Sequence, residues 1–172
     1  MATVREIYQY LDGLAPFSLQ MDFDNAGFLV GRGDRQVKKL LVALDITQEV
    51  AEEAVELGAE LIVSHHPVIF HPAKSVTDGD PDGRILLTLI EGGVAAICAH
   101  TNLDAVTGGV NDALAQALGL TQIEQLHQDG VDPAGRPYGI GRVGTVAGAP
   151  KYAPEFAAFV KKALGANGVR YV

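Results

Sequence analysis

Two kinds of hydrophobic run alternate along the chain. In one kind the apolar residues recur every three or four positions, as on one face of an α-helix, and in the other they form a short continuous run, as in a buried strand. Helices are predicted over Val4–Leu14, Thr47–Leu57 (with Thr47 as the cap), Arg84–Glu91 and Val110–Leu118, and strands over Lys39–Asp45, Leu61–Ser64 and Val94–Ala99. Apolar strands alternating with amphipathic helices predict an α/β fold, with a mostly parallel sheet covered by helices on both faces.

The later part of the chain has a different pattern. Two strands near Ile123–Gln128 and Tyr138–Val146 flank the turn-rich sequence DGVDPAGRP, which predicts a β-hairpin. A last helix is predicted from Pro154, in its favoured first-turn position, to about Leu164. The closing residues, VRYV, resemble the opening of a further strand.

Length and composition place the chain among ordinary globular proteins. Its 172 residues suit a single domain over 1–172, and a hydrophobic content of 48% excludes a disordered chain. With 13 Lys and Arg against 21 Asp and Glu, the formal net charge is −8. This acidic balance argues against a nucleic-acid partner or an anionic membrane surface, both of which need clustered cations.

The start of the chain and its cysteine usage predict a cytoplasmic location. Arg5, Glu6 and Asp12 interrupt the first segment, which therefore does not read as a signal peptide, and no run of about 18 uncharged apolar residues predicts a membrane span. The single cysteine, Cys98, lies in the apolar run VAAICA. We expect it to be a buried, inert thiol in a reducing compartment.

Histidines follow two of the predicted parallel strands. His65 and His66 come directly after Leu61–Ser64, and His100 comes directly after the next predicted strand, with Asp104 four residues further on. The carboxyl ends of neighbouring parallel strands meet at one edge of a sheet, where such folds keep their ligand crevice. The three imidazoles and the Asp104 carboxylate are therefore expected to converge there.

Three imidazoles and a carboxylate are a ligand set for Zn, Mn, Fe, Co or Ni rather than for Ca or Mg. Side chains of adjacent residues diverge, so His65 and His66 are expected to serve two ions a few ångströms apart. The alternative is that these histidines are structural, hydrogen-bonded residues near strand ends. His71 and His127 are interpreted as surface residues.

Other polar groups offer weaker signals. Asp24 lies in the glycine-rich MDFDNAGFLVG, where a simple turn is equally expected, and it is one candidate general base. Asp45, another candidate, follows the first strand and could hold an imidazole N–H or begin the Thr47 cap. Gly108 and Gly109 could expose the amides of a helix N-terminus to an anion. The sequence contains no GxxxxGK[ST], GxGxxG, GxSxG or HExxH motif.

Taken together, DNAGFLVG, VALDIT, ELIVSHHPVIF and AHTNLDAVTGGVNDALA resemble one family, the toroidal, hexameric dinuclear-metal proteins called GTP cyclohydrolase I type 2 homologues. The resemblance runs along the whole chain in order and spacing. It implies that His65, His66, His100 and Asp104 ligate two metal ions. It also implies an α/β fold assembled as a homohexamer, with the metal sites facing an internal cavity.

The sequence departs from the family in one motif. Family members close the site with His-x-x-x-Glu near the C-terminus, whose Glu bridges the two metals, and no histidine here is followed four positions later by Glu. We therefore expect a C-terminally truncated form or a short variant, which holds one ion firmly or two weakly.

The resemblance implies a metal-dependent hydrolase of small anionic or nucleotide-like substrates, although no residue pattern identifies a guanine pocket. The alternative is a non-catalytic metal-binding scaffold or a regulatory or assembly protein. Under both hypotheses the expected partners are copies of the chain itself. The hydrolase would in addition bind a small-molecule substrate.

Overall fold

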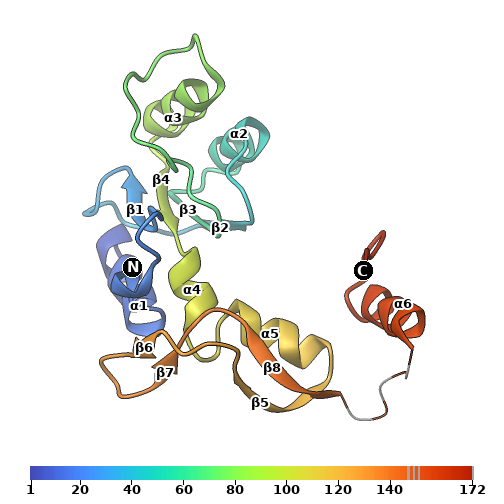
Figure 1. The fold of residues 1–172 in the computed structure, drawn as a ribbon. Helices are drawn as coiled ribbons and strands as arrows, with labels where there is room; N and C mark the ends of the chain where they lie inside the picture. Colours follow the sequence, from blue (N-terminus) through green and yellow to red (C-terminus); the bar gives the residue numbers. More distant parts are fainter. Residues whose placement is uncertain (147, 149, 151, 172) are drawn as a thin grey trace. The chain divides into compact units, whose positions relative to one another are not determined.

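The computed structural model describes residues 1–146, 148, 150 and 152–171. They form two compact units, Met1–Leu103 and Asp104–Val172 (Figure 1). Whether these units fold together as the single domain expected over residues 1–172 is a separate matter, and the single domain stays a prediction. Among the described residues, no helix combines the length and the apolar content needed to cross a membrane.

The first unit is built on a four-stranded sheet of mixed direction. The strand order is β1 (Gly27–Val30), β4 (Ala95–Cys98), β3 (Leu61–Ser64), β2 (Leu40–Ala43). Strands β2, β3 and β4 are parallel, and β1 pairs antiparallel with β4. The predicted α/β class with a mostly parallel sheet is therefore confirmed.

Helices cover both faces of this sheet, because alternate strand residues point to opposite sides. On one face, α2 (Gln48–Glu56) and α3 (Pro81–Gly92) pack in a core that includes Ile62 and Ala96. On the other, α1 (Val4–Leu14) packs against Leu61 and its neighbours together with the short 3-10 helix Phe17–Leu19. Figure 1 shows α2 and α3 side by side beyond the strands of the sheet.

The helix caps explain where these helices begin. Thr3 and Glu6 make the predicted capping box of α1, which has the predicted bounds. Helix α3 begins three residues before the predicted Arg84, because the Asp80 side chain accepts the Gly83 N–H at 2.8 Å and Pro81 occupies the first turn.

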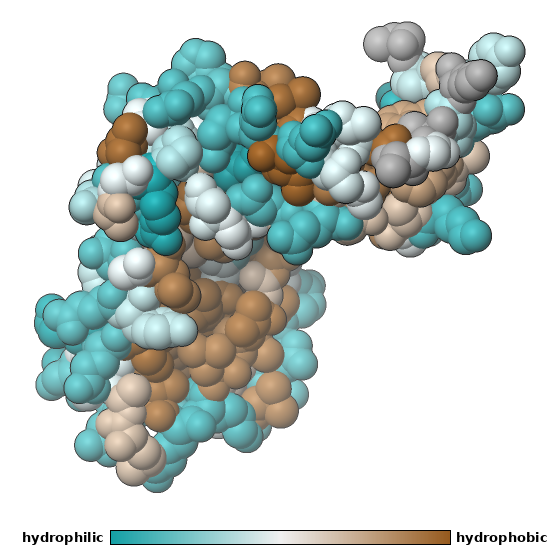
Figure 2. Space-filling view, turned by 90° about the horizontal axis from the view of Figure 1, so that it is seen from below, coloured by the Kyte–Doolittle hydropathy of each residue, from teal (hydrophilic) through white to brown (hydrophobic). Residues whose placement is uncertain are grey.

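The outer strand β2 departs from the prediction of a buried strand. Val42 is 73% exposed, and Leu40 and Leu44 are also exposed. β2 lies at an edge of the sheet, and none of its described residues belongs to the core cluster under α1. Hydrophobic side chains reach the surface elsewhere too, and Figure 2 shows them gathered among hydrophilic residues on one face.

The second unit contains helix α5 (Val110–Ala117), then β5 (Leu120–Gln125) paired antiparallel with β8 (Arg142–Val146), and helix α6 (Ala153–Ala163). The predicted hairpin and last helix are thus present. β5 begins earlier than predicted because Gly119, at φ +67°, ends α5 and the strand follows at once.

The connection between β5 and β8 contains a short second ribbon. Its strands are β6 (Gly130–Val131) and β7 (Pro137–Tyr138), which pair antiparallel. β7 takes the start of the strand predicted over Tyr138–Val146. Residues 169–171 form no strand, and Val172, the last residue of the predicted one, lies outside the described residues.

Candidate metal centre

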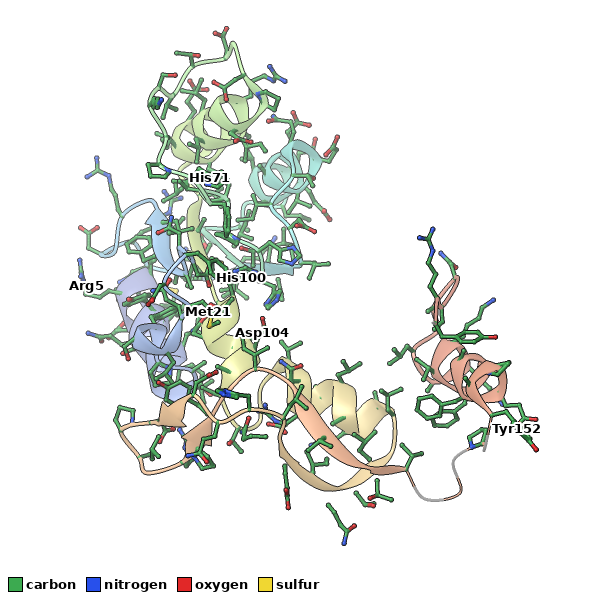
Figure 3. All side chains as sticks on the ribbon, in the orientation of Figure 1. Arg5, Met21, His71, His100, Asp104 and Tyr152 are labelled. Carbon is green, nitrogen blue, oxygen red and sulfur yellow. The ribbon has the colours of Figure 1, made fainter. Side chains whose placement is uncertain are left out.

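Three imidazole rings gather at the carboxyl edge of the parallel strands. The ring centroids of His65 and His66 are 5.0 Å apart, and those of His65 and His100 and of His66 and His100 are 5.1 and 5.5 Å apart. One nitrogen from each ring can be chosen so that all three lie within 4.8 Å of one another. Figure 3 shows His100 just beyond the end of β4.

The register of two strands brings the rings together. β3 and β4 are adjacent and parallel, and their last residues, Ser64 and Cys98, are directly paired. The residues that follow them therefore emerge at one edge of the sheet, as predicted from the sequence. The Ser64 carbonyl accepts the Ala99 N–H at 2.9 Å, and its hydroxyl donates to the His66 carbonyl at 2.8 Å, which holds the backbone of the cluster.

The expected divergence of His65 and His66 is wrong. Adjacent side chains point to opposite faces only while the backbone is extended as in a strand. β3 ends at Ser64 and the chain bends over His65 and His66. Both rings can then face His100.

Each ring is held through its Nδ1 by an oxygen acceptor. His65 Nδ1 lies 2.9 Å from the Ala99 carbonyl oxygen, His66 Nδ1 lies 2.6 Å from an Asp45 carboxylate oxygen, and His100 Nδ1 lies 2.8 Å from Asp24 Oδ1. A carbonyl or an ionised carboxylate can only accept, so each Nδ1 carries the hydrogen. In the neutral ring this tautomer leaves the lone pair on Nε2, which is the arrangement of metal-binding histidines whose other nitrogen is held by a carboxylate or carbonyl.

Asp24 is the most deeply engaged of these acceptors. Its side chain is fully buried beside His100. It accepts hydrogen bonds from His100, from the N–H of Asn25 and from both the N–H and the hydroxyl of Thr101. Burial raises the pKa of Asp24, but the hydrogen bonds from Thr101 and His100 outweigh it and leave the pKa below its usual value.

The Asp45–His66 pair lies nearer to solvent. The two side chains are 53% and 46% exposed. The contact confirms the prediction that Asp45 holds an imidazole N–H. Asp45 does not cap the following helix; Thr47 does, through its side chain, which accepts the Val50 N–H. Water screens this pair more than it screens Asp24 and His100.

The Asp24–Asn25 segment contributes more than sequence reasoning indicated. The sequence predicts Asp24 only as a turn residue or a candidate base, and it assigns no role to Asn25. The Asn25 side-chain amide donates to the Ile69 carbonyl at 2.5 Å, which ties this segment to the loop after the two histidines. The only signal in the sequence was an Asp-Asn pair set among apolar residues.

Asp104 follows the cluster on the short helix α4 (Thr101–Ala105). It is the first residue of the second unit, whereas the three histidines belong to the first. Its proposed part in metal binding stays a prediction.

The remaining predicted residues have structural or surface positions. Cys98 is buried, its thiol donates to the His65 carbonyl, and burial raises its pKa to about 12. His71 is exposed and stacks edge-on against Phe70. His127 is 78% exposed, as predicted, although it does have a partner in Asp129.

The predicted anion seat at Gly108 and Gly109 is filled by the chain itself. The Gly108 N–H donates to Asp112 Oδ2 at 2.6 Å. The same carboxylate binds the Arg142 guanidinium, whose side chain is only 3% exposed.

A cavity of about 580 Å³ has Asp45 in its wall, beside the residues that follow the histidines. The first turns of α2 and α3 contribute Glu49 and Asp82 to the lining, and among the described residues only Arg84 adds a positive charge. A ligand in this cavity would lie beside the Asp45 carboxylate that holds His66.

These features define an α/β protein with a histidine cluster that could hold a divalent metal ion, at the edge where such sheets keep their ligands. The family model of Duf34/NIF3 (NGG1p interacting factor 3) matches residues 2–172. The chain belongs to this family.

Curated relatives carry the name "GTP cyclohydrolase 1 type 2 homolog". The Clostridium perfringens protein is 36% identical over 168 residues, which are 98% of this chain and 63% of the relative. The Halalkalibacterium halodurans protein is 43% identical over 126 residues, or 73% of this chain and 34% of the relative. The chain thus spans less than two thirds of the length of these relatives, 63% of the first and 34% of the second.

Among solved structures, a hypothetical protein of Staphylococcus aureus aligns with a TM-score of 0.89 at 30% identity. The alignment covers 99% of this chain and 67% of that one. The shared fold extends through both units of the chain.

Proposed function

We propose that this protein binds a divalent transition metal through His65, His66 and His100 and acts as a metal-dependent hydrolase of small anionic or nucleotide-like substrates. One observation carries the metal site: each Nδ1 is held by an acceptor while the three rings offer nitrogens within 4.8 Å of one another. Structural histidines need no such convergence.

The three imidazoles suit Zn, Mn, Fe, Co or Ni. We propose Asp104 as a further ligand, on the family resemblance and its place one turn into the helix after His100. A second ion is proposed on the same resemblance. When bound, such an ion acts as a Lewis acid and lowers the pKa of a coordinated water to about 7.

The residues of the chain would orient the ligands and hold protons in place. Asp24 and Asp45 fix the ring orientation and the tautomer of His100 and His66, so that in each neutral ring the lone pair is on Nε2. The cavity beside Asp45 is lined by more carboxylates than cations. An anionic substrate there would therefore depend on the charge of the bound ion.

The test is a hydrolysis assay with phosphoesters and nucleotides, on protein loaded in turn with Zn, Mn, Fe, Co or Ni. We expect turnover that disappears in the double variant His65→Ala/His66→Ala and persists in His71→Ala/His127→Ala, which removes two exposed histidines outside the cluster. Turnover that survives in the first variant would refute the metal-hydrolase proposal.

A second candidate is a non-catalytic metal-binding scaffold or regulatory protein. It is favoured by the engagement of Asp24 and Asp45, since each accepts from a ring nitrogen and a carboxylate so engaged is poorly placed to take a proton from water. The absence of turnover with every metal, in protein that binds the metal, would favour this candidate.

We further propose a cytoplasmic homo-oligomer, a hexamer by family resemblance, with no nucleic-acid or membrane partner. The buried thiol of the single cysteine supports a reducing compartment, and the net charge of −8 argues against binding to nucleic acid.

A further inference from the structure

A second cavity lies at the opposite end of β4 from the histidines. It has a volume of about 470 Å³ and is lined by Gly31, Arg32, Arg35, Leu89, Ile90, Gly93 and Val94. Val94 precedes β4 and His100 follows it. The four strand residues between them span about 13 Å at roughly 3.3 Å each, so the cavity is separate from the candidate metal centre.

Two glycines shape this cavity. Gly31 has φ +107°, and a Cβ there would come within 2.8 Å of the Ala95 Cα. Gly93 has φ +66°, and a Cβ there would come within 2.4 Å of a terminal nitrogen of Arg35. Both positions therefore need glycine for the backbone conformation and for space, and the Arg35 guanidinium lies directly against the backbone at Gly93.

The two guanidinium groups make no direct ion pair with any carboxylate of the described residues. Within the described part of the chain, neither Arg32 nor Arg35 makes an ion pair or a side-chain hydrogen bond, whereas Arg136 and Arg142 are paired with carboxylates. The pKa of Glu60 is lowered chiefly by hydrogen bonds from the N–H groups of Lys39 and Lys38, and the charge of Arg35 also lowers it, without a direct ion pair between the two side chains. In a chain with 21 acidic and 13 basic residues, two such cations in one cavity have hydrogen-bonding capacity left for a ligand.

The rest of the lining is apolar. Leu89 and Val94 belong to the core and are 0% and 1% exposed, so Ile90, which is 57% exposed, supplies the accessible apolar surface. None of the described residues that line this cavity is acidic, in contrast to the cavity beside Asp45. One guanidinium group can donate two parallel hydrogen bonds to two oxygens of a phosphate. The apolar wall formed by Ile90 can contact a ring of the same ligand. The cavity volume lies within the usual range for small-molecule sites.

The geometry points to a binding site for a phosphorylated small molecule of about nucleotide size, with its phosphate on Arg32 and Arg35 and its apolar or heterocyclic part against the exposed side chain of Ile90. The site needs no metal, and it does not depend on the hydrolase proposal.

The test is calorimetric titration of the metal-free full chain with AMP, inorganic phosphate and adenosine. We expect AMP to bind more tightly than either of its parts. Arg32→Gln and Arg35→Gln should each weaken AMP binding by about tenfold, the loss expected for one charged hydrogen-bonding partner. Arg170→Gln, which removes the same charge from an exposed position in the second unit, should leave it unchanged.

Three results with the wild type and the two arginine variants would overturn the proposal. These are no AMP binding at millimolar concentration, AMP binding that both Arg32→Gln and Arg35→Gln leave intact, and equal affinity for AMP and phosphate, which would remove the role of the apolar wall. A His66→Ala variant separates the two sites. Loss of AMP binding in that variant would place the nucleotide at the histidine cluster and contradict the inference.

Discussion

The Nδ1 of His100 donates to Asp24 Oδ1 at 2.8 Å, although the two residues are 76 positions apart in the chain. The Asp24 side chain is fully buried and the His100 side chain is 17% exposed. The bond therefore fixes one ring of the cluster where water competes little, and it links the segment before β1 to the end of β4.

We predict that Asp24→Asn weakens metal binding by about 10- to 100-fold, because the His100 ring loses the carboxylate that orients it. The measurement is the dissociation constant for Zn by competition with a chelator of known affinity. Asp129→Asn is the matched control, since it changes the carboxylate partner of His127, an exposed histidine outside the cluster. Equal affinities in the wild type and Asp24→Asn, with both proteins folded, would contradict the prediction.

Asp45→Asn should have a smaller effect than Asp24→Asn, a loss of less than about tenfold in affinity for Zn. Both side chains of the Asp45–His66 pair are about half exposed, so solvent and salt screen their interaction. The same competition assay at low and high salt checks this. If Asp45→Asn lost as much affinity for Zn as Asp24→Asn, or more, the more deeply buried carboxylate would not be the more important one, and the prediction would be wrong.

The convergence of the histidines could be predicted because it depends on a general property of parallel strands, whose carboxyl ends meet at one edge. The roles of Asp24 and Asn25 could not be predicted, because their partners His100 and Ile69 are far away in sequence. The orientation of His65 and His66 depends on a bend in the backbone that no residue type dictates.

The same distinction holds for the fold. β3 and α1 have the predicted bounds because their signals are local, an apolar run and a capping box. The sequence predicts no strand at the position of β1, because the glycine-rich MDFDNAGFLVG is equally consistent with a turn around Asp24 and Asn25. The pairing of β1 with β4 is decided about 70 residues further along. The exposure of Val42 follows from the place of β2 at the sheet edge, which the strand sequence alone does not specify.

In the second unit, Asp112→Ala should lower the free energy of unfolding by about 3 kcal/mol, because it leaves the buried Arg142 guanidinium without its carboxylate. Urea unfolding at pH 7 measures this. Asp82→Ala, an exposed residue of α3, serves as the control and should change stability little.

The Asp112 contribution should also depend on pH. Its pKa is lowered chiefly by the hydrogen bond from Arg142. A lowered folded-state pKa stabilises the fold above the unfolded value of about 3.9, and the contribution disappears as the pH falls through the folded value. The stability difference between wild type and Asp112→Ala should therefore be full above about pH 5 and shrink below pH 4. A difference that stays constant down to pH 2 would contradict the role of the ionised carboxylate.

The Cys98 thiol should not react with Ellman's reagent in the native protein at pH 8, and it should react stoichiometrically in urea. It is 1% exposed and lies in β4, so the reagent cannot reach it without unfolding. Reaction of the native protein within seconds would show that the carboxyl end of β4 opens readily.

The metal content of the purified protein tests the proposed metal site most directly. Mass spectrometric metal analysis after dialysis should find about one tightly held transition metal ion per chain, and none in His65→Ala/His66→Ala/His100→Ala. The control His71→Ala/His127→Ala should retain the ion. An equal metal content in the wild type and the triple variant, or no retained metal in the wild type after loading with each of Zn, Mn, Fe, Co and Ni, would contradict a metal site at the three histidines.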